Sequence, residues 1–256
     1  MHLTRSLITS TLAFGALGAI GQAQAQATVK NDGQMRASFG LGASLSSGNS
    51  QASNLSMTGD AVRATDLNKT SLYGSAQYAR SGGTSTSEQL RLGGRYDHNL
   101  NVQWFAFGGL DLERNKLANL QLRNLLSGGL GYHALKTPTT TWDLIGGLGY
   151  TSDRYIDPMV IAGDNRSTYG YPAVLLGEES THKLSDSTSF KQRLTLVPNL
   201  KNRGEFRANL DAGLSVAMSK AMNLNVGFAL AHNSEPGAGR KSTDSLLTTG
   251  VSVKFD

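Results

Sequence analysis

The chain has 256 residues, with 30 glycines, 5 prolines, no cysteine and a formal net charge of +5. Without cysteine the protein has neither a disulfide framework nor a thiol nucleophile. The basic residues are scattered along the chain rather than clustered, so we expect no nucleic-acid partner.

The first 25 residues have the features of a secretory signal peptide. Arg5 supplies a positive start, residues 7–20 are apolar, and Ala23-Gln24-Ala25 matches a small-residue cleavage site. A short membrane anchor is the alternative, but the apolar stretch is too short to cross a bilayer comfortably. We therefore expect a cleaved signal peptide at 1–25 and a single domain at 26–256.

Apolar and polar residues alternate with a period of two through most of the remaining chain. Phe39 and Leu41, for example, alternate with Ser38 and Arg36, which is the pattern of a β-strand with two different faces. The division of 171–199 at 185–187 rests on weak alternation, but without it the strand count would be odd, which single-chain bacterial barrels avoid. The region 152–170 is expected to be a long irregular loop. We predict about twelve strands, near 34–46, 51–65, 72–78, 90–97, 104–113, 122–133, 142–151, 171–184, 188–199, 205–219, 222–234 and 242–255.

The expected connections alternate between tight turns, such as 66–69 and 136–139, and longer segments, such as 80–87 and 198–205. Transmembrane barrels have short periplasmic turns and longer extracellular loops. The fold class is therefore predicted to be all-β, an antiparallel transmembrane β-barrel in the bacterial outer membrane.

Aromatic residues gather at the ends of the predicted strands, on the apolar face. Two such belts are typical of the two membrane interfaces, whereas the core of a soluble β-sandwich gives no reason for them. The predicted girdle consists of Tyr78, Tyr96, Trp104, Tyr132, Trp142, Tyr150, Tyr171 and Phe255.

The C-terminal segment 248–255 resembles the signal that the outer-membrane assembly machinery reads on bacterial barrels. Gly250, Val253 and Phe255 occupy its small, apolar and aromatic positions. Asp256 follows the aromatic residue, which is a departure from the usual ending. We expect the assembly machinery to be a partner during biogenesis, and membrane lipid and lipopolysaccharide to be partners afterwards.

Motifs along the whole mature chain resemble a bacterial family of salt-induced outer-membrane proteins, the YdiY-like family of unknown function. The resemblance implies an outer-membrane barrel with a role in envelope adaptation, and it supplies no catalytic residue, metal or cofactor. The motifs are Gly40-x-Gly42, Ser47-Gly48-Asn49-Ser50, Gly128-Gly129-Leu130-Gly131-Tyr132, Gly177-Glu178-Glu179, Gln192-Arg193-Leu194, Pro198-Asn199-Leu200 and Lys241 to Thr248.

The polar face carries charges that would line the lumen of such a barrel and set its selectivity. Bases outnumber acids among them, which indicates weak anion preference in a passive diffusion channel. The same charges could instead pair and plug the barrel, which would then act through its loops. The lumen candidates are Arg36, Arg91, Arg95, Asp111, Glu113, Arg123, Asp143, Arg193, Arg207 and Asp211, with Arg63, Lys191, Lys254 and Asp97 beside them.

Two further alternatives remain open. His232 and Ser234 have the spacing of a base and nucleophile, as in some outer-membrane hydrolases, but the residues after them do not resemble such an enzyme, and we expect no catalysis. A soluble lipocalin-like binder would carry the apolar face inside.

Overall fold

The computed structural model describes residues 27, 29–46, 52–161, 163–236 and 242–255. The predicted signal peptide, the turn at 47–50 and Asp256 lie outside the described residues. Among the described residues, no helix has the length and apolar character that crossing a membrane requires.

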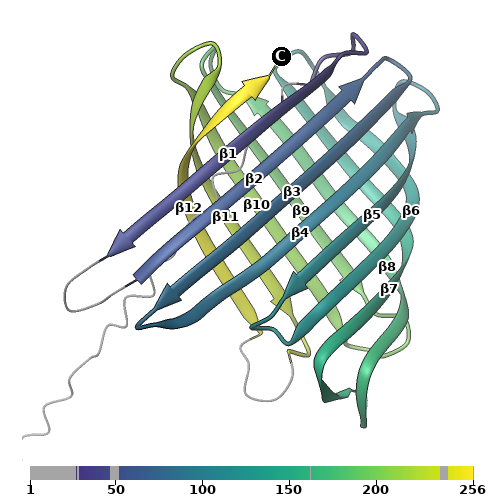
Figure 1. Cartoon of the computed structure of the whole chain (residues 1–256). Coiled ribbons are helices and arrows are strands. Elements are labelled where there is room, and N and C mark those ends of the chain that lie inside the picture. Colours follow the sequence, from purple (N-terminus) through teal and green to yellow (C-terminus); the bar gives the residue numbers. More distant parts are fainter. Residues whose placement is uncertain (1–26, 28, 47–51, 162, 237–241, 256) are drawn as a thin grey trace, which may run out of the picture.

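The described residues form twelve strands that close into one antiparallel barrel (Figure 1). Every strand pairs with its neighbours in sequence, and closure comes from pairing of the first strand with the last. The strands are β1 (Met35–Ser46), β2 (Ala52–Ala64), β3 (Asn68–Ser81), β4 (Thr84–Asn99), β5 (Trp104–Asn115), β6 (Leu120–Lys136), β7 (Thr140–Ile161), β8 (Asp164–Lys183), β9 (Thr188–Pro198), β10 (Phe206–Ala217), β11 (Met222–Asn233) and β12 (Thr243–Phe255).

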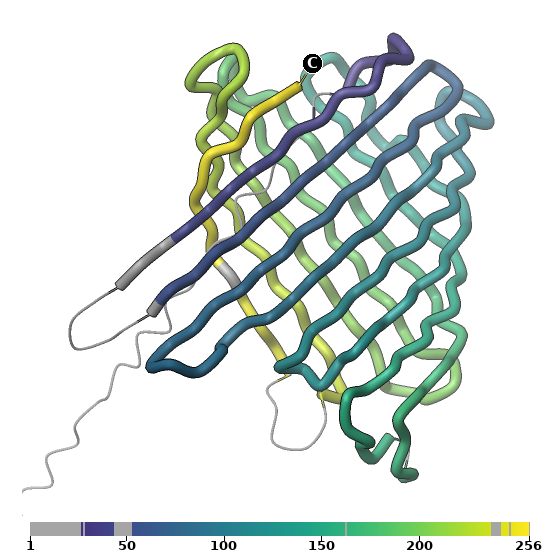
Figure 2. Tube along the Cα trace, in the orientation of Figure 1, coloured from purple at the N-terminus to yellow at the C-terminus, as the bar shows by residue number. Residues whose placement is uncertain are grey.

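The closing pair joins the two ends of the chain. Phe39 of β1 lies opposite Val253 of β12, and Leu41 lies opposite Val251. Figure 2 shows the two strands side by side along the near wall. The pairing covers residues 37–41 of β1 and 251–255 of β12, so the two ends of the sheet are hydrogen-bonded there, as a barrel that crosses a lipid layer requires.

The prediction of about twelve antiparallel strands is confirmed, including the division at 185–187, where β8 and β9 are separate strands. The short connections 65–67, 100–103, 137–139, 184–187 and 218–221 lie together with the C-terminus at one end of the barrel, which we call the turn end. The connection 199–205 and the described residues 234–236, which follow β11, lie at the opposite end, which we call the loop end.

The prediction of an irregular loop at 152–170 is wrong. Strands β7 and β8 continue through this region as a hairpin that extends past the neighbouring strands (Figure 1). Their register shifts between Arg154 and Met159. This irregularity, with Pro158 inside it, interrupts the period-two pattern and so hid the strand from sequence reading.

The expected longer connection at 80–87 is also mostly strand. Strands β3 and β4 are joined at Gly82 and Gly83, whose φ angles are 56° and 81°. Two successive residues with positive φ make a tight hairpin turn that glycine adopts without strain.

The barrel has its apolar face outside and its polar face inside. Leu126 and Leu148 are 63% and 65% exposed on the outer surface, whereas Thr151 and Ser252 are 0% exposed on the inner one. A water-soluble barrel would have the opposite arrangement, because burial of apolar surface stabilises folding in water. The arrangement is that of a transmembrane β-barrel, with lipid as its outer solvent, and it excludes the lipocalin-like alternative.

Glycines on the inner wall make room for aromatic rings. A Cβ atom at Gly93 would collide with the ring of Tyr73, and one at Gly131 would collide with the ring of Phe105. Each ring therefore comes from a neighbouring strand and covers the backbone of the glycine opposite it.

Candidate functional site

The lumen is the candidate functional site, and charged side chains from most of the wall project into it. The ten residues predicted to line the lumen all lie on inward-facing positions of their strands, which alternate with exposed apolar residues. They are Arg36, Arg91, Arg95, Asp111, Glu113, Arg123, Asp143, Arg193, Arg207 and Asp211.

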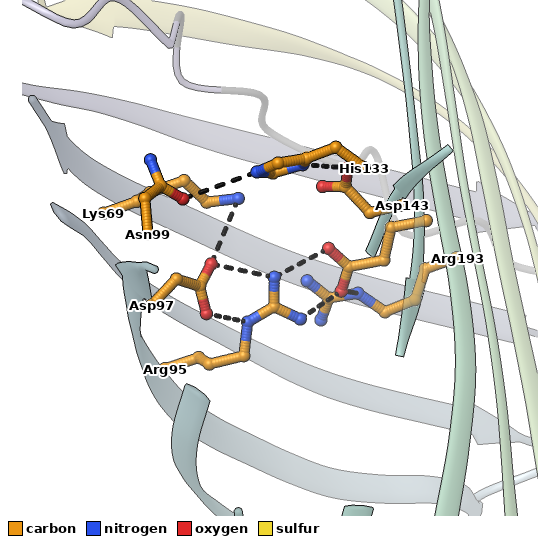
Figure 3. A network of polar contacts seen from close by, with 8 residues as sticks. Lys69, Arg95, Asp97, Asn99, His133, Asp143 and Arg193 are labelled. Carbon is orange, nitrogen blue, oxygen red and sulfur yellow. Dashed lines mark hydrogen bonds and ion pairs between the residues drawn. The ribbon is translucent and has the colours of Figure 1, made fainter. Parts of the chain in front are cut away.

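One group of these charges, the turn-side cluster, consists of Lys69, Arg95, Asp97, Glu179 and Arg193. Arg95 donates to Glu179 through Nη1 at 2.6 Å and through Nη2 at 2.9 Å. Its Nε lies 2.8 Å from Asp97 Oδ1. Figure 3 shows Arg95 and Arg193 approaching one another from different strands.

The turn-side cluster crosses the barrel. Lys69 on β3 pairs with Asp97 at 3.4 Å, and Arg193 on β9 pairs with Glu179 at 2.8 Å. Strands β3 and β9 are six places apart in either direction around the closed sheet. The guanidinium of Arg193 also lies 5.4 Å from the ring centroid of Tyr73 on β3. Opposite walls are therefore tied together, and the lumen is narrow at this level.

A pair formed by His133 and Asp143 lies beside the turn-side cluster (Figure 3). His133 Nδ1 is 2.7 Å from Asp143 Oδ1, and His133 Nε2 is 3.4 Å from Asn99 Oδ1. The carboxylate fixes the ring orientation, since one ring nitrogen must donate to it.

A second group, the loop-side cluster, consists of Glu113, Arg123, Asp153 and Tyr155. Arg123 donates to both carboxylate oxygens of Asp153 at 2.7 Å and lies 3.6 Å from Glu113. The Tyr155 hydroxyl donates to Asp153 at 3.2 Å. Such bidentate, charge-assisted pairs are among the stronger polar contacts in proteins.

Arg207 reaches the same region from β10. Its Nη2 donates to Thr151 Oγ1 at 3.0 Å, and its guanidinium lies 5.7 Å from the ring centroid of Tyr171. Tyr171 is 2% exposed and faces the lumen, so its assignment to the membrane girdle is wrong. In the register of β7 and β8 it pairs with the inward-facing Thr151, which the irregular pattern before it had concealed.

Arg36 lies near the turn end of the lumen rather than at its centre. Its guanidinium forms a salt bridge of 2.6 Å with Asp32, just before β1. The hydrogen bonds from Arg36 hold the pKa of the Asp32 carboxyl well below its usual range. Arg63, in contrast, was expected in the lumen but is exposed on the outward face, where it donates to the Gly33 carbonyl at 2.8 Å, because it shares its face with Leu55 and Met57.

The other girdle candidates lie on the outer surface, as exposed or partly exposed side chains. Trp104 and Tyr132 lie against each other there, with ring centroids 5.0 Å apart. The outward set comprises Tyr78, Tyr96, Trp104, Tyr132, Trp142, Tyr150 and Phe255. Gly250, Val253 and Phe255 lie on the closing strand β12, and their role in assembly stays a prediction.

The structure gives no support for a hydrolytic pair. His232 Nδ1 contacts Thr243 Oγ1 at 2.8 Å and its ring stacks on Phe206, while Ser234 Oγ accepts from the Phe206 amide at 2.8 Å. Within the described residues no hydrogen bond joins His232 to Ser234, so the base and nucleophile are not in reacting geometry.

Four charged lumen residues were missed as candidates, namely Asp60, Lys69, Asp153 and Glu179. Glu179 pairs directly with Arg193 in the hairpin register, so counting outward from the turn at 185–187 would have found it. Lys69 was assigned to a turn and Asp153 to a loop, and both lie on inward-facing strand positions.

Comparison with solved structures finds distant barrels. The NanC porin is 14% identical, with 86% of this chain and 97% of that chain covered and a TM-score of 0.47. The translocator domain of the autotransporter NalP from Neisseria meningitidis is 14% identical, with 87% of each chain covered and a TM-score of 0.45. The KdgM porin is 11% identical, with 87% and 99% covered and a TM-score of 0.42. These likenesses are too distant to transfer a substrate.

Sequence comparison finds nearer relatives. The uncharacterized protein YdiY of Escherichia coli (strain K12) is 24% identical over 166 residues, which are 65% of this chain and 61% of that protein. The chain thus spans less than two thirds of its relative's length. A family model described as protein of unknown function, DUF481, matches residues 39–255. Because this match covers nearly all of the barrel, the chain belongs to the DUF481 family.

Proposed function

We propose that the protein is a narrow passive diffusion channel of the bacterial outer membrane, secreted with a cleaved signal peptide and without catalytic activity. The observation that carries the proposal is the pair of ion-pair clusters inside a barrel whose outer face is apolar. Charges inside a membrane barrel must be paired or reach water, since burial of an unpaired charge is costly.

Part of the lumen is accessible to water at the turn-side cluster. The side chains of Lys69 and Arg193 are 30% and 32% exposed, although both project inward. Glu179, Asp153 and Asp60 add negative charge to the lumen, so the excess of bases is smaller than the sequence indicated. We therefore propose small ions and solutes as cargo, with selectivity set by local charge rather than by net charge.

A closed barrel acting through its loop end is the second candidate. It is favoured by the contact of Arg193 with Tyr73 across the lumen and by the complete burial of inward polar residues such as Thr151 and Ser252. A role in adaptation of the envelope to salt rests on the family resemblance alone.

Planar-bilayer recording of the refolded protein tests the proposal. We expect discrete conductance steps in potassium chloride, and larger steps from Glu179→Gln, because that change releases Arg95 and Arg193 from the bridge across the lumen. Protein that is folded by its heat-modifiable migration in gels but gives no steps would contradict the channel and favour the closed barrel.

A further inference from the structure

Arg207 differs from the other arginines of the two clusters, because within the described residues it pairs with no carboxylate. Arg95 and Arg123 each bind a carboxylate through two nitrogens. Arg207 has one hydrogen bond, to Thr151 Oγ1. Its Nε is buried and has no hydrogen-bond partner.

This unpaired guanidinium is nine-tenths buried, since Arg207 is 9% exposed. Arginine keeps its charge at all accessible pH values and has five N–H donors. Leaving those donors without acceptors in a buried place costs free energy. A buried arginine in this condition can donate to an acceptor that comes from outside the protein.

The space for that acceptor is present beside it. Arg207 lines a cavity of about 80 Å³ inside the loop end of the lumen. One water molecule needs about 10–15 Å³ of such space, so the cavity can hold a group of several non-hydrogen atoms. Its lining also includes Arg123, Asp153, Tyr171, Glu205 and Glu235.

The charges around the cavity make Arg207 its one cation with unsatisfied donors among the described lining residues. Arg123 is already neutralised by Asp153 and Glu113. Glu205 accepts through Oε2 from the side chains of Asn199 and Asn202 at 2.7 and 3.3 Å, so this carboxylate is held away from Arg207 by its own hydrogen bonds.

The shape of the site favours a planar ligand group. The guanidinium lies 5.7 Å from the ring centroid of Tyr171, Thr151 accepts from Nη2, and Nε has no hydrogen-bond partner among the described residues. A guanidinium edge matches a carboxylate with two parallel hydrogen bonds. Glu205 and Glu235 line the same cavity and oppose a second negative charge on the ligand.

We infer that Arg207 is the centre of a binding site for the carboxylate group of a small monoanionic solute, at the loop-end entrance to the lumen. As a statement about the solute that enters, this inference rests on the proposed channel function. Binding itself can be measured without a bilayer, which keeps the two claims separate.

The test is a titration of the full-length mature barrel, refolded in detergent and labelled with ¹⁵N-arginine, followed by the Nε–Hε signals in NMR. The signal of Arg207 is identified by its absence from Arg207→Met. Sodium acetate is the probe, and sodium chloride at the same ionic strength is the control. We expect the Arg207 signal to shift saturably with acetate and to stay in place with chloride.

Lys201→Met is the matched control variant. Lys201 is an exposed cation at the same entrance, 5.3 Å from the ring centroid of Tyr169, and does not line the cavity. We expect this variant to keep the acetate response. Arg207→Lys keeps the positive charge but loses the paired N–H donors of the guanidinium, and it should weaken acetate binding by roughly tenfold. Heat-modifiable migration in gels establishes that this variant is folded.

An Arg207 signal that does not move, or that moves equally with chloride, would overturn the site. Bilayer recordings then separate the two claims. Acetate binding without conductance removes the channel and keeps the site, while conductance without acetate binding keeps the channel and removes the site.

Discussion

The turn-side and loop-side regions of the lumen use arginine in two different ways. At the turn side, Arg95 and Arg193 share Glu179 and tie one wall to the other. At the loop side, Arg123 is paired with Asp153 but Arg207 has no carboxylate. An inward arginine is thus a structural tie where an acid faces it, and a binding group where a cavity faces it.

The turn-side tie should carry the largest contribution to stability. Glu179→Gln leaves Arg95 and Arg193 without their shared carboxylate, and we expect the free energy of unfolding to fall by about 3 kcal/mol. Urea unfolding in lipid vesicles, followed by emission of the lipid-facing Trp104 and Trp142, measures it. Glu178→Gln is the matched control, because the side chain of Glu178 faces outward and accepts a hydrogen bond from Gln192. Equal losses of unfolding free energy in the two variants would contradict a structural role of Glu179 across the lumen.

The pair of Arg123 and Asp153 in the loop-side cluster should make the second-largest contribution to the free energy of unfolding. Asp153→Asn removes one of the two oxygens that accept from Arg123, and we expect a loss of about 2 kcal/mol in the same unfolding measurement. Asp157→Asn is the control, because Asp157 lies further along the same strand and is exposed. A loss below that of the control would mean that Arg123 finds other acceptors.

Lys69, at the edge of the turn-side cluster, should contribute less to the free energy of unfolding. Lys69 is partly exposed and 3.4 Å from Asp97, so water screens its charge. We expect Lys69→Met to lower the free energy of unfolding by about 0.5 kcal/mol, with the loss decreasing in high salt. A salt-independent loss would show that the lysine contributes through packing.

Arg207 should contribute least to stability, which distinguishes it most clearly from the arginines that pair with carboxylates. Arg207→Met removes a buried charge and leaves no carboxylate behind, so we expect the free energy of unfolding to change by less than about 0.5 kcal/mol. A loss comparable with that of Glu179→Gln would mean that Arg207 is a structural tie as well, and the distinction between the two ends would fail.

The sequence by itself determined the strands, their number and which face meets lipid. Alternation, a local property with a period of two, separates Phe39, Leu41 and Leu148 from Arg95 and Arg123 as two faces. The C-terminal signal and the aromatic girdles then indicated which of the two faces meets lipid. Alternation failed where the period is broken, between Arg154 and Met159, and Tyr171 was misplaced beyond that point.

Only the tertiary structure decided which charges meet. Arg95 and Glu179 are 84 residues apart, and their contact depends on the strand number and closure of the barrel, which bring β4 and β8 to the same level. The same holds for Arg207, because only the folded barrel determines which side chains lie near it and that no carboxylate among the described residues pairs with it. Alternation states that a side chain points inward; the closed sheet alone determines what it finds there.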